Sequence, residues 1–219
     1  MLTLHLLNRE LPLLEVAPPP LSAEIEELVA ATRVRLSVPP LWNGPALLAT
    51  HVGPDGIECY GSDYASYLTH VDISDRRDIS PFGIGCIGAC LIPFAPDGRT
   101  LWTQRSSRVL EGGTWQVGVA GAVEPGERPS EAALREAREE LGLALVAPVP
   151  LAVLHGEHSV GVYVVFAAPV DPETELVLDS HEVTDARWCR NPLDELDPLH
   201  PNIVPIWRAL QCVWPPAAA

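Results

Sequence analysis

The sequence predicts an α/β fold for residues 82–219, preceded by a small α+β region over residues 1–81. Residues 130–141 are mostly strong helix formers, which indicates a helix in the second part. The runs FGIGCIGACLIPF and RTLWTQRS are strand-like and flank a turn at residues 96–98. This second part is expected to begin the main sheet.

The first 81 residues contain their own helix and strand signals. Residues 23–35 have a helical pattern, and PALLATHV and IECY are strand-like around the turn GPDG. The stretch DYASYLTH is helical in character, and residues 42–44, WNG, predict a turn. Three roles stay open for this region: the contact of a homodimer, a lid over a bound nucleotide, or packing that completes the core.

The helix at residues 130–141 has recognisable ends. Pro125 and Gly126 break the chain before it, and Pro129 is tolerated in a first helical turn. Ser130 is a candidate N-cap, and Gly142 ends the helix. A loop, a helix and a turn are therefore expected here from local chemistry alone.

One sector of this helix is acidic. Glu136, Glu139 and Glu140 share it because positions i, i+3 and i+4 are neighbours on a helix. The adjoining apolar stripe is formed by Ala133, Leu134, Ala137 and Leu141. Clustered carboxylates repel one another and suit a hard divalent cation such as Mg²⁺, which takes substrate phosphates as further ligands. Arg135 lies beside this sector, where it can orient Glu139 one turn on, although an ordinary ion pair fits equally well.

The segment from Gly121 to Leu143 also fits the spacing Gx5Ex7REUxEExGU, with U aliphatic, at every specified place. The fixed places are Gly121, Glu127, Arg135, Glu136, Glu139, Glu140 and Gly142. This segment resembles the Nudix box, and the chain is similar to the Nudix hydrolase family. The resemblance implies an α/β/α sandwich with a mixed sheet, and a Mg²⁺- or Mn²⁺-dependent attack of water on a diphosphate.

The resemblance also implies roles for individual residues. By motif position, Glu136, Glu139 and Glu140 are expected metal ligands and Glu127 a supporting carboxylate. The backbone carbonyl of Ala120 is an expected further ligand. Arg135 and Glu139 are expected to take part in catalysis.

The catalytic base is expected after the box. The family commonly carries a glutamate just before a late strand, and Glu182 precedes a strand-like run that ends in Trp188. Its neighbour His181 is an alternative because imidazole titrates near neutral pH. His155 and His158 are further alternatives, although exposed loop positions explain all three histidines.

Residues before the box are candidates for substrate binding. Arg105 and Arg108 can hold phosphates through bidentate hydrogen bonds, and Trp115 can stack on a base. Surface pairing is the alternative for the arginines, and core packing is the alternative for Trp115. The chain has no lysine, so its phosphate-binding side chains are expected to be arginines.

The substrate is expected to be a nucleoside diphosphate linked to another group. Similarity to Nudix proteins that act on UDP-sugars rests on LWNGPALL, DYASYL and QRSSRVLEGG. The coenzyme A branch shares LWTQRS, but Leu110 replaces its second arginine. The proline that marks the ADP-ribose branch is absent from HSV at 158–160. Hydrolysis of a dNTP to release pyrophosphate is a further alternative activity.

Two alternative functions belong to classes other than the hydrolases. Isopentenyl diphosphate isomerase shares the fold, but its cysteine motif is missing from WQVGVAGAV before the box. A catalytically weak nucleotide sensor typically loses box glutamates and gains a basic DNA-binding domain, and neither feature is present.

The composition of the chain limits which binding partners are expected. The chain has 14 basic and 29 acidic residues, a net charge of −15, and should repel nucleic acid. No apolar run approaches the roughly 18 residues that cross a membrane. The start of the chain does not resemble a signal peptide, and five cysteines without CxxC pairs predict free thiols in a cytoplasmic protein.

Overall fold

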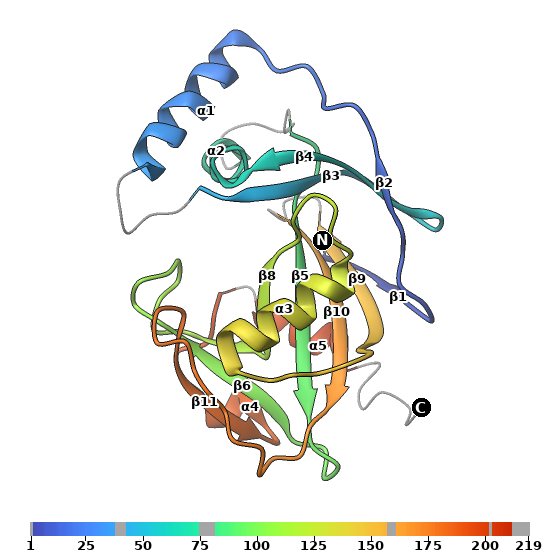
Figure 1. Ribbon diagram of the computed structural model, residues 1–219, viewed down its shortest axis with the longest axis vertical. Coiled ribbons are helices and arrows are strands. Elements are labelled where there is room, and N and C mark those ends of the chain that lie inside the picture. Colours follow the sequence, from blue (N-terminus) through green and yellow to red (C-terminus); the bar gives the residue numbers. More distant parts are fainter. Residues whose placement is uncertain (1, 38–42, 75–81, 157–160, 202, 212–219) are drawn as a thin grey trace.

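A computed structural model of the chain describes residues 2–37, 43–74, 82–156, 161–201 and 203–211. Figure 1 shows residues 13–74 above a larger body that holds residues 2–6 and the elements from residue 85 onward. The helices are α1 (Ala23–Leu36), α2 (Tyr64–Ser74), α3 (Pro129–Leu141), α4 (Pro192–Glu195) and α5 (Ile203–Leu210). None of the helices in these ranges is long and apolar enough to cross a membrane.

The strands join into one sheet. They are β1 (Leu2–Leu6), β2 (Leu13–Glu15), β3 (Pro45–Gly53), β4 (Gly56–Asp63), β5 (Gly85–Phe94), β6 (Thr100–Arg105), β7 (Trp115–Val117), β8 (Val119–Ala122), β9 (Val149–Gly156), β10 (Gly161–Pro169) and β11 (Val183–Cys189). The main order is β1-β9-β10-β5-β3-β4-β2, with β8 and β6 also paired to β5 and with β7 and β11 paired to β6.

Strand β5 connects all parts of the sheet. One edge pairs in parallel with β10 along its whole length, from Cys86 opposite Gly161 to Phe94 opposite Pro169. The other edge pairs antiparallel with β3, then β8, then β6. The strand is buried from Gly85 to Pro93, as expected for a strand covered on both faces. The sheet is therefore mixed, as predicted.

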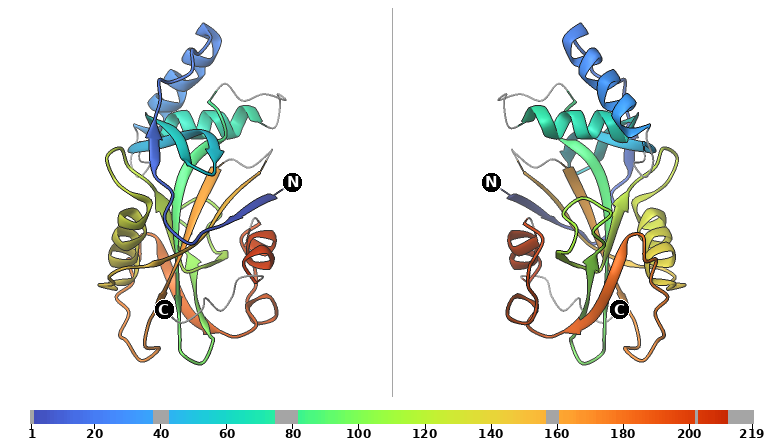
Figure 2. Two further views of the ribbon diagram at one scale, coloured as in Figure 1. Left: turned by 90° about the vertical axis from the view of Figure 1, so that its right-hand side faces the viewer. Right: turned by 90° about the vertical axis from the view of Figure 1, so that its left-hand side faces the viewer.

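Helices cover both faces of the sheet, which confirms the expected α/β sandwich. In the side views, α3 lies on one side of the sheet, and α2 and α5 lie on the other (Figure 2). Helix α3 packs on Ile87, Ala89 and Leu91 of β5, whereas Trp207 of α5 packs in a cluster with Cys90. Alternate side chains of β5 thus pack against helices on opposite faces of the sheet.

The first 81 residues form the predicted elements and extend the main sheet. Strand β1 pairs antiparallel with β9, and β3 pairs with β5 at Leu48 and Ala49. The helix predicted at residues 23–35 is α1, whose first turn is capped by the Ser22 hydroxyl. The boundary predicted near Ser80 and Pro81 lies outside the described residues. The two parts share one apolar core, because Leu11, Leu47 and Ile57 cluster with residues of α3 and β10.

The structure shows where the two predicted turns of the N-terminal region lie. The predicted GPDG turn joins β3 to β4 as a hairpin, with Gly53 opposite Gly56. Of the WNG turn, Trp42 lies outside the described residues. The Asn43 side chain accepts a hydrogen bond from the Ala65 backbone at 2.7 Å, and the Gly44 carbonyl accepts one from Tyr64 at 3.0 Å. This turn therefore holds the start of α2.

Candidate active site

Helix α3 presents the acidic sector, and its ends are defined. The N-cap is Arg128, whose backbone N–H donates to Glu131 at 2.9 Å, and Gly142 ends the helix with a left-handed φ of 68°. The prediction of Ser130 as the cap was wrong. The Ser130 backbone and hydroxyl both donate to the Glu10 carboxylate at 2.8 Å, so a residue of the N-terminal region completes the helix start.

The apolar side of α3 is docked on the sheet. Of the predicted stripe, Ala133, Ala137 and Leu141 are fully buried, and Leu134 is half-buried. Ala132 is also buried in the same cluster. The helix therefore cannot rotate without exposing this apolar surface, and the position of its carboxylates is fixed.

Two of the three sector carboxylates face inward. Glu140 is 3% exposed and Glu136 is 8% exposed, whereas Glu139 is exposed. The Glu136 carboxylate lies directly against the first glycine of the box, Gly121 on β8. A Cβ atom on Gly121 would lie 1.9 Å from Glu136 Oε1, so any larger residue here would displace the Glu136 carboxylate.

Arg135 lies between three carboxylates. Its Nε donates to Glu127 at 2.9 Å, and its Nη1 donates to Glu136 at 2.5 Å and to Glu139 at 3.2 Å. Its Nη2 also donates to the carbonyl of Ala122 on β8 at 3.0 Å. The side chain therefore joins α3, the preceding loop and β8, and it is in contact with Glu139, which it was expected to orient.

The loop before β11 brings Glu182 to this acidic site. The carbonyl of Glu182 accepts from the Ser106 backbone at 2.8 Å, and the carbonyl of Glu140 accepts from the Asp179 backbone at 3.0 Å. Strand β11 then pairs Val183 with Arg105 at the end of β6. Glu182 is therefore placed beside Glu136 and Glu140, although 42 residues separate it from Glu140.

The electrostatics of the site favour a bound cation. Burial raises the pKa of Glu140 well above its usual range, and the charges of Glu136 and Glu182 raise it further. Burial also raises the pKa of Glu136, and Glu139 and Glu182 add to this effect against the opposing charge of Arg135. A divalent cation would stabilise the ionised forms of these carboxylates.

The donor set fits such a cation, although the side chains do not enclose one. Within the described ranges, no three His, Cys, Asp or Glu side chains converge closely enough to form a complete metal cage. The buried carboxylate oxygens of Glu136 and Glu140 are hard ligands, and Glu139 is held one turn away by Arg135. Ala120, whose carbonyl was expected to be a further ligand, lies on β8 opposite Cys90.

Arg105 is a second basic residue whose charge acts on this acidic site. Its Nε donates to the Leu110 carbonyl at 2.8 Å, and its Nη1 donates to the Gln116 side chain at 2.8 Å. Its charge acts on the Glu140 carboxyl and lowers the pKa of that group, against the larger effects of burial. The structure therefore places a fixed cationic side chain beside the carboxylates.

Comparison with known proteins agrees with this geometry. A sequence model of the NUDIX domain matches residues 86–209. The chain belongs to the NUDIX family. The chain is also 32% identical over 118 residues to the CTP pyrophosphohydrolase of Escherichia coli, an alignment that covers 53% of this chain and 85% of that protein.

Solved Nudix structures are similar to part of the chain. A Nudix hydrolase from M. smegmatis is 28% identical, with a TM-score of 0.46, over 59% of this chain and 84% of that one. A MutT Nudix hydrolase from Burkholderia pseudomallei is 28% identical, with a TM-score of 0.45, over 53% of this chain and 91% of that one. As a Nudix pyrophosphohydrolase, this protein hydrolyses pyrophosphate bonds in nucleotide-linked compounds, and enzymes of this family generally use divalent metal ions.

The other two predicted substrate-binding residues of this Nudix protein have different surroundings. Trp115 is 2% exposed, packs in the apolar cluster under α5, and has the Arg187 guanidinium 4.8 Å from its ring centroid. The expectation that Trp115 stacks on a base is therefore corrected to a packing role. Arg108 is exposed in the loop after β6, and only its backbone N–H has a described contact, with the Ser106 hydroxyl.

The alternative histidines do not converge on the acidic site. His181 is exposed, and its backbone N–H donates to Asp179. His155 stacks on His5 of β1, with ring centroids 5.2 Å apart, and β9 pairs only with β1 and β10 among the described strands. His158 lies outside the described residues. The charge of Glu182, another candidate base, raises the pKa of both Glu136 and Glu140.

The sequence interpretation missed several residues around the Nudix site. Glu10 contacts the start of α3, Gln116 holds Arg105, and Tyr163 lies near the box on β10. Only Tyr163 had a usable signal, as a polar aromatic residue in the otherwise apolar run GVYVVFAA. The contacts of Glu10 and Gln116 depend on tertiary structure, which a local pattern does not encode.

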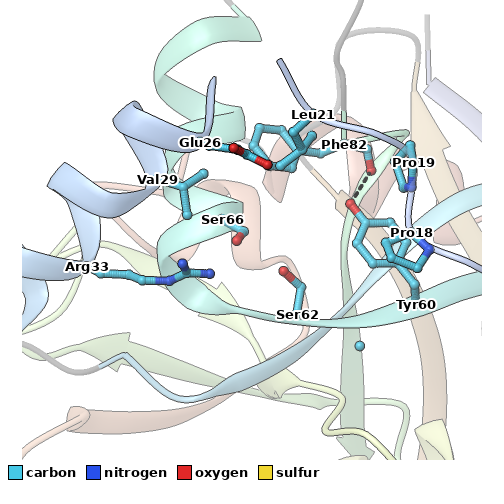
Figure 3. A pocket seen from close by; sticks show the side chains of 11 residues that line it. Pro18, Pro19, Leu21, Glu26, Val29, Arg33, Tyr60, Ser62, Ser66 and Phe82 are labelled. Carbon is cyan, nitrogen blue, oxygen red and sulfur yellow. Dashed lines mark hydrogen bonds between the residues drawn. The ribbon is translucent and has the colours of Figure 1, made fainter. Parts of the chain in front are cut away.

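Two cavities of the described chain are not lined by the buried carboxylates of the acidic sector. One, of about 330 Å³, lies between α1, α2 and β4 in the N-terminal region, where Arg33, Ser62 and Tyr60 contribute to its lining (Figure 3). The other, of about 590 Å³, lies between the N-terminal segment and the box loop. Neither is lined by Glu136 or Glu140, so chemistry rather than cavity size identifies the candidate active site.

Proposed function

We propose that this protein hydrolyses the diphosphate bond of a nucleoside diphosphate linked to a further group. The observation that carries this proposal is the pair of buried carboxylates on α3, Glu136 and Glu140, which lie within reach of the charges of Glu182 and of the held guanidinium of Arg105. Buried acidic groups attract cations, and a fixed arginine binds a phosphate oxygen. The carboxylates and the arginine together suit a polyanionic substrate that binds as a complex with a divalent cation. The cation would offset the repulsion between the substrate and this acidic protein.

The metal ligands in this proposal are the sector carboxylates. Glu136, Glu139 and Glu140 would hold Mg²⁺ or Mn²⁺, with the Ala120 carbonyl as a further ligand and Glu127 in support. A bound divalent ion supplies charge neutralisation of the phosphates and a lower pKa for water. Arg135 positions the carboxylates of Glu127 and Glu139 through the hydrogen bonds described above.

Glu182 is the proposed base. Its carboxylate accepts a proton from the attacking water while the water oxygen forms a bond to phosphorus. The bond from that phosphorus to the bridging oxygen breaks, and the released phosphate takes the electron pair. Arg105 holds a non-bridging oxygen during this step. The products are two monophosphate esters, one of them a nucleoside monophosphate.

Two substrate classes are favoured by separate observations. The motifs LWNGPALL, DYASYL and QRSSRVLEGG are similar to those of UDP-sugar-hydrolysing Nudix proteins. The relative from Escherichia coli is a CTP pyrophosphohydrolase, which favours a pyrimidine nucleoside triphosphate as the second candidate. Both classes present a pyrophosphate next to a nucleoside, as the acidic site requires.

A substrate panel with added Mg²⁺ or Mn²⁺ tests the proposal. UDP-glucose, CTP, ADP-ribose, NADH, coenzyme A, dinucleoside polyphosphates and oxidised dNTPs are incubated with the protein, and the products are separated by anion-exchange chromatography. Turnover that requires the metal and yields a nucleoside monophosphate supports the proposal. No turnover on any compound, combined with tight binding of one, overturns it in favour of a sensor.

A further inference from the structure

The N-terminal region contributes two tyrosines to the neighbourhood of the active site. Tyr64 and Tyr67 lie in the first turn of α2, and their ring centroids are 5.4 Å apart at an interplanar angle of 43°. The turn at Asn43 and Gly44 fixes this end of the helix through two backbone contacts. Both rings are half-buried, so part of each aromatic surface faces solvent.

A third tyrosine lies on the main sheet between these rings and the box. Tyr163 of β10 lies over Gly88 of β5, where an added Cβ would be 3.2 Å from its ring. The same point is 3.5 Å from the carbonyl of Gly121, the first residue of the box. Tyr67 and Ala122 of β8 pack on a common apolar cluster that includes Cys86. The tyrosines therefore border the strand that precedes the catalytic helix.

Arg105 links this aromatic group to the acidic site. Its charge acts on the phenols of Tyr64, Tyr67 and Tyr163, and also on the Glu140 carboxyl. Hydrogen bonds to Leu110 and Gln116 hold its guanidinium in place. A phosphate bound by Arg105 would therefore lie near both the acidic residues and the tyrosines.

The phenols stay uncharged under physiological conditions. Burial raises the pKa of Tyr163 to about 12 and also raises the pKa of Tyr64 and Tyr67. Neutral rings do not repel phosphates, and their faces stack on planar heterocycles. This combination suits the nucleoside end of a nucleotide.

We propose that Tyr64, Tyr67 and Tyr163 form a binding site for the nucleobase of the substrate, with Arg105 on the adjacent phosphate. This inference rests on the proposed function, since it names the part of the same site that selects the substrate. It gives the N-terminal region a direct role in recognition. Tyr64 and Tyr67 lie outside residues 86–209, the part of the chain that matches the NUDIX domain.

Binding measurements without catalysis test this inference. UMP, CMP, AMP and GMP are titrated calorimetrically into the full chain, and ribose 5-phosphate serves as a ligand with the phosphate and sugar but no base. The variants are Tyr64→Leu and Tyr67→Leu, which keep bulk but lose the ring. We expect about tenfold weaker binding of the preferred nucleotide and little change for ribose 5-phosphate. Tyr64→Phe and Tyr67→Phe keep the rings and should retain most of the affinity.

The matched control is Tyr60→Phe. Tyr60 lies in the same region, but its hydroxyl donates to the Phe82 carbonyl at 3.2 Å and it lines the cavity under α1. This variant should bind nucleotides like the wild type. In hydrolysis assays the Leu variants should raise KM about tenfold and leave kcat within a few-fold.

The outcomes separate this inference from the proposed function. Equal affinity of the Leu variants and the wild type for the preferred nucleotide overturns the inference even when hydrolysis is normal. A wild-type protein that binds no nucleotide more tightly than ribose 5-phosphate also overturns it. A wild type that hydrolyses nothing, yet loses nucleotide binding on Tyr→Leu substitution, supports the inference and overturns only the proposed function.

Discussion

At the scale of single residues, the candidate reaction centre holds a buried carboxyl group beside like charges. Glu140 is almost fully buried and lies beside the like charges of Glu136 and Glu182. Burying a charged carboxylate costs several kcal/mol unless an opposite charge is near. Arg135 offsets part of this cost for Glu136, and a cation would offset the remainder. Such a cost is retained where binding requires it.

Replacing either Glu139 or Glu140 by Gln should therefore separate activity from stability. Turnover with Mg²⁺ should fall at least 100-fold, because a proposed metal ligand loses its charge. The melting temperature of Glu140→Gln in chelator should be unchanged or higher, because a buried repulsion is removed. Steady-state kinetics and thermal unfolding measure both effects. Glu27→Gln, an exposed change on α1, is the control, and near-normal turnover in both site variants would contradict the metal assignment.

The environment of Asp63 predicts how the stability of the fold depends on pH. Burial would raise the pKa of its carboxyl, but hydrogen bonds from Arg33, Ser66 and Asn43 lower it from 3.8 to about 2. The folded pKa is below the unfolded value, so this carboxylate stabilises the fold above about pH 4 and less as the pH falls toward 2. Asp63→Asn should cost about 1 kcal/mol at neutral pH, a modest value because Arg33 is exposed.

Urea unfolding at several pH values measures this effect. The stability difference between Asp63→Asn and the wild type should shrink between pH 4 and pH 2 and be nearly absent at the lower value. Asp55→Asn, in the exposed hairpin turn between β3 and β4, should follow the wild type throughout. A difference that is constant over this range would show that the Asp63 charge does not contribute.

At the scale of elements, the catalytic helix depends on a distant carboxylate. Glu10 accepts two hydrogen bonds at the start of α3, from a residue 120 positions later in the chain. A negative charge at a helix N-terminus is favourable, and it also satisfies a backbone N–H that the helix leaves free. The position of α3, and therefore of its glutamates, is linked to the N-terminal segment.

Glu10→Ala should lower the free energy of unfolding by about 1 kcal/mol, which is typical for loss of a capping side chain. It should also lower kcat several-fold, because the first turn of α3 loses its anchor. Denaturant unfolding and steady-state kinetics with Mg²⁺ measure the two effects. Glu27→Ala, which removes an exposed carboxylate from α1, should change neither quantity. Identical behaviour of the two variants would refute the anchoring role.

The elements also show what the sequence could predict. Helix α3 was placed to within one residue at its start, because Pro129 and Gly142 act locally on the backbone. The contact of Ser130 was misassigned because its partner, Glu10, is far away in the sequence. Glu182 was predicted from its position before a strand, whereas Tyr64 and Tyr67 depend on how α2 packs. Local chemistry is readable from sequence, and long-range packing is not.

At the scale of the whole molecule, the N-terminal region and the NUDIX domain share a sheet and a core. Strand β1 pairs with β9, β3 pairs with β5, and Leu11 and Ile57 pack with residues of α3. Pairing that crosses between two parts of a chain couples their unfolding. The molecule should therefore unfold in one cooperative transition.

A fragment of residues 82–219 tests this coupling. It lacks β1, which pairs with β9, and β3, which pairs with the first part of β5, and it exposes apolar side chains that Leu11, Leu47 and Ile57 cover in the full chain. We expect it to bind a hydrophobic dye, to aggregate, and to unfold without a sharp transition. Co-expression with residues 1–81 should restore a soluble complex with one transition, which calorimetry and size-exclusion chromatography can measure. A soluble fragment that unfolds cooperatively and hydrolyses the substrate like the full chain would show instead that the NUDIX domain folds and acts alone.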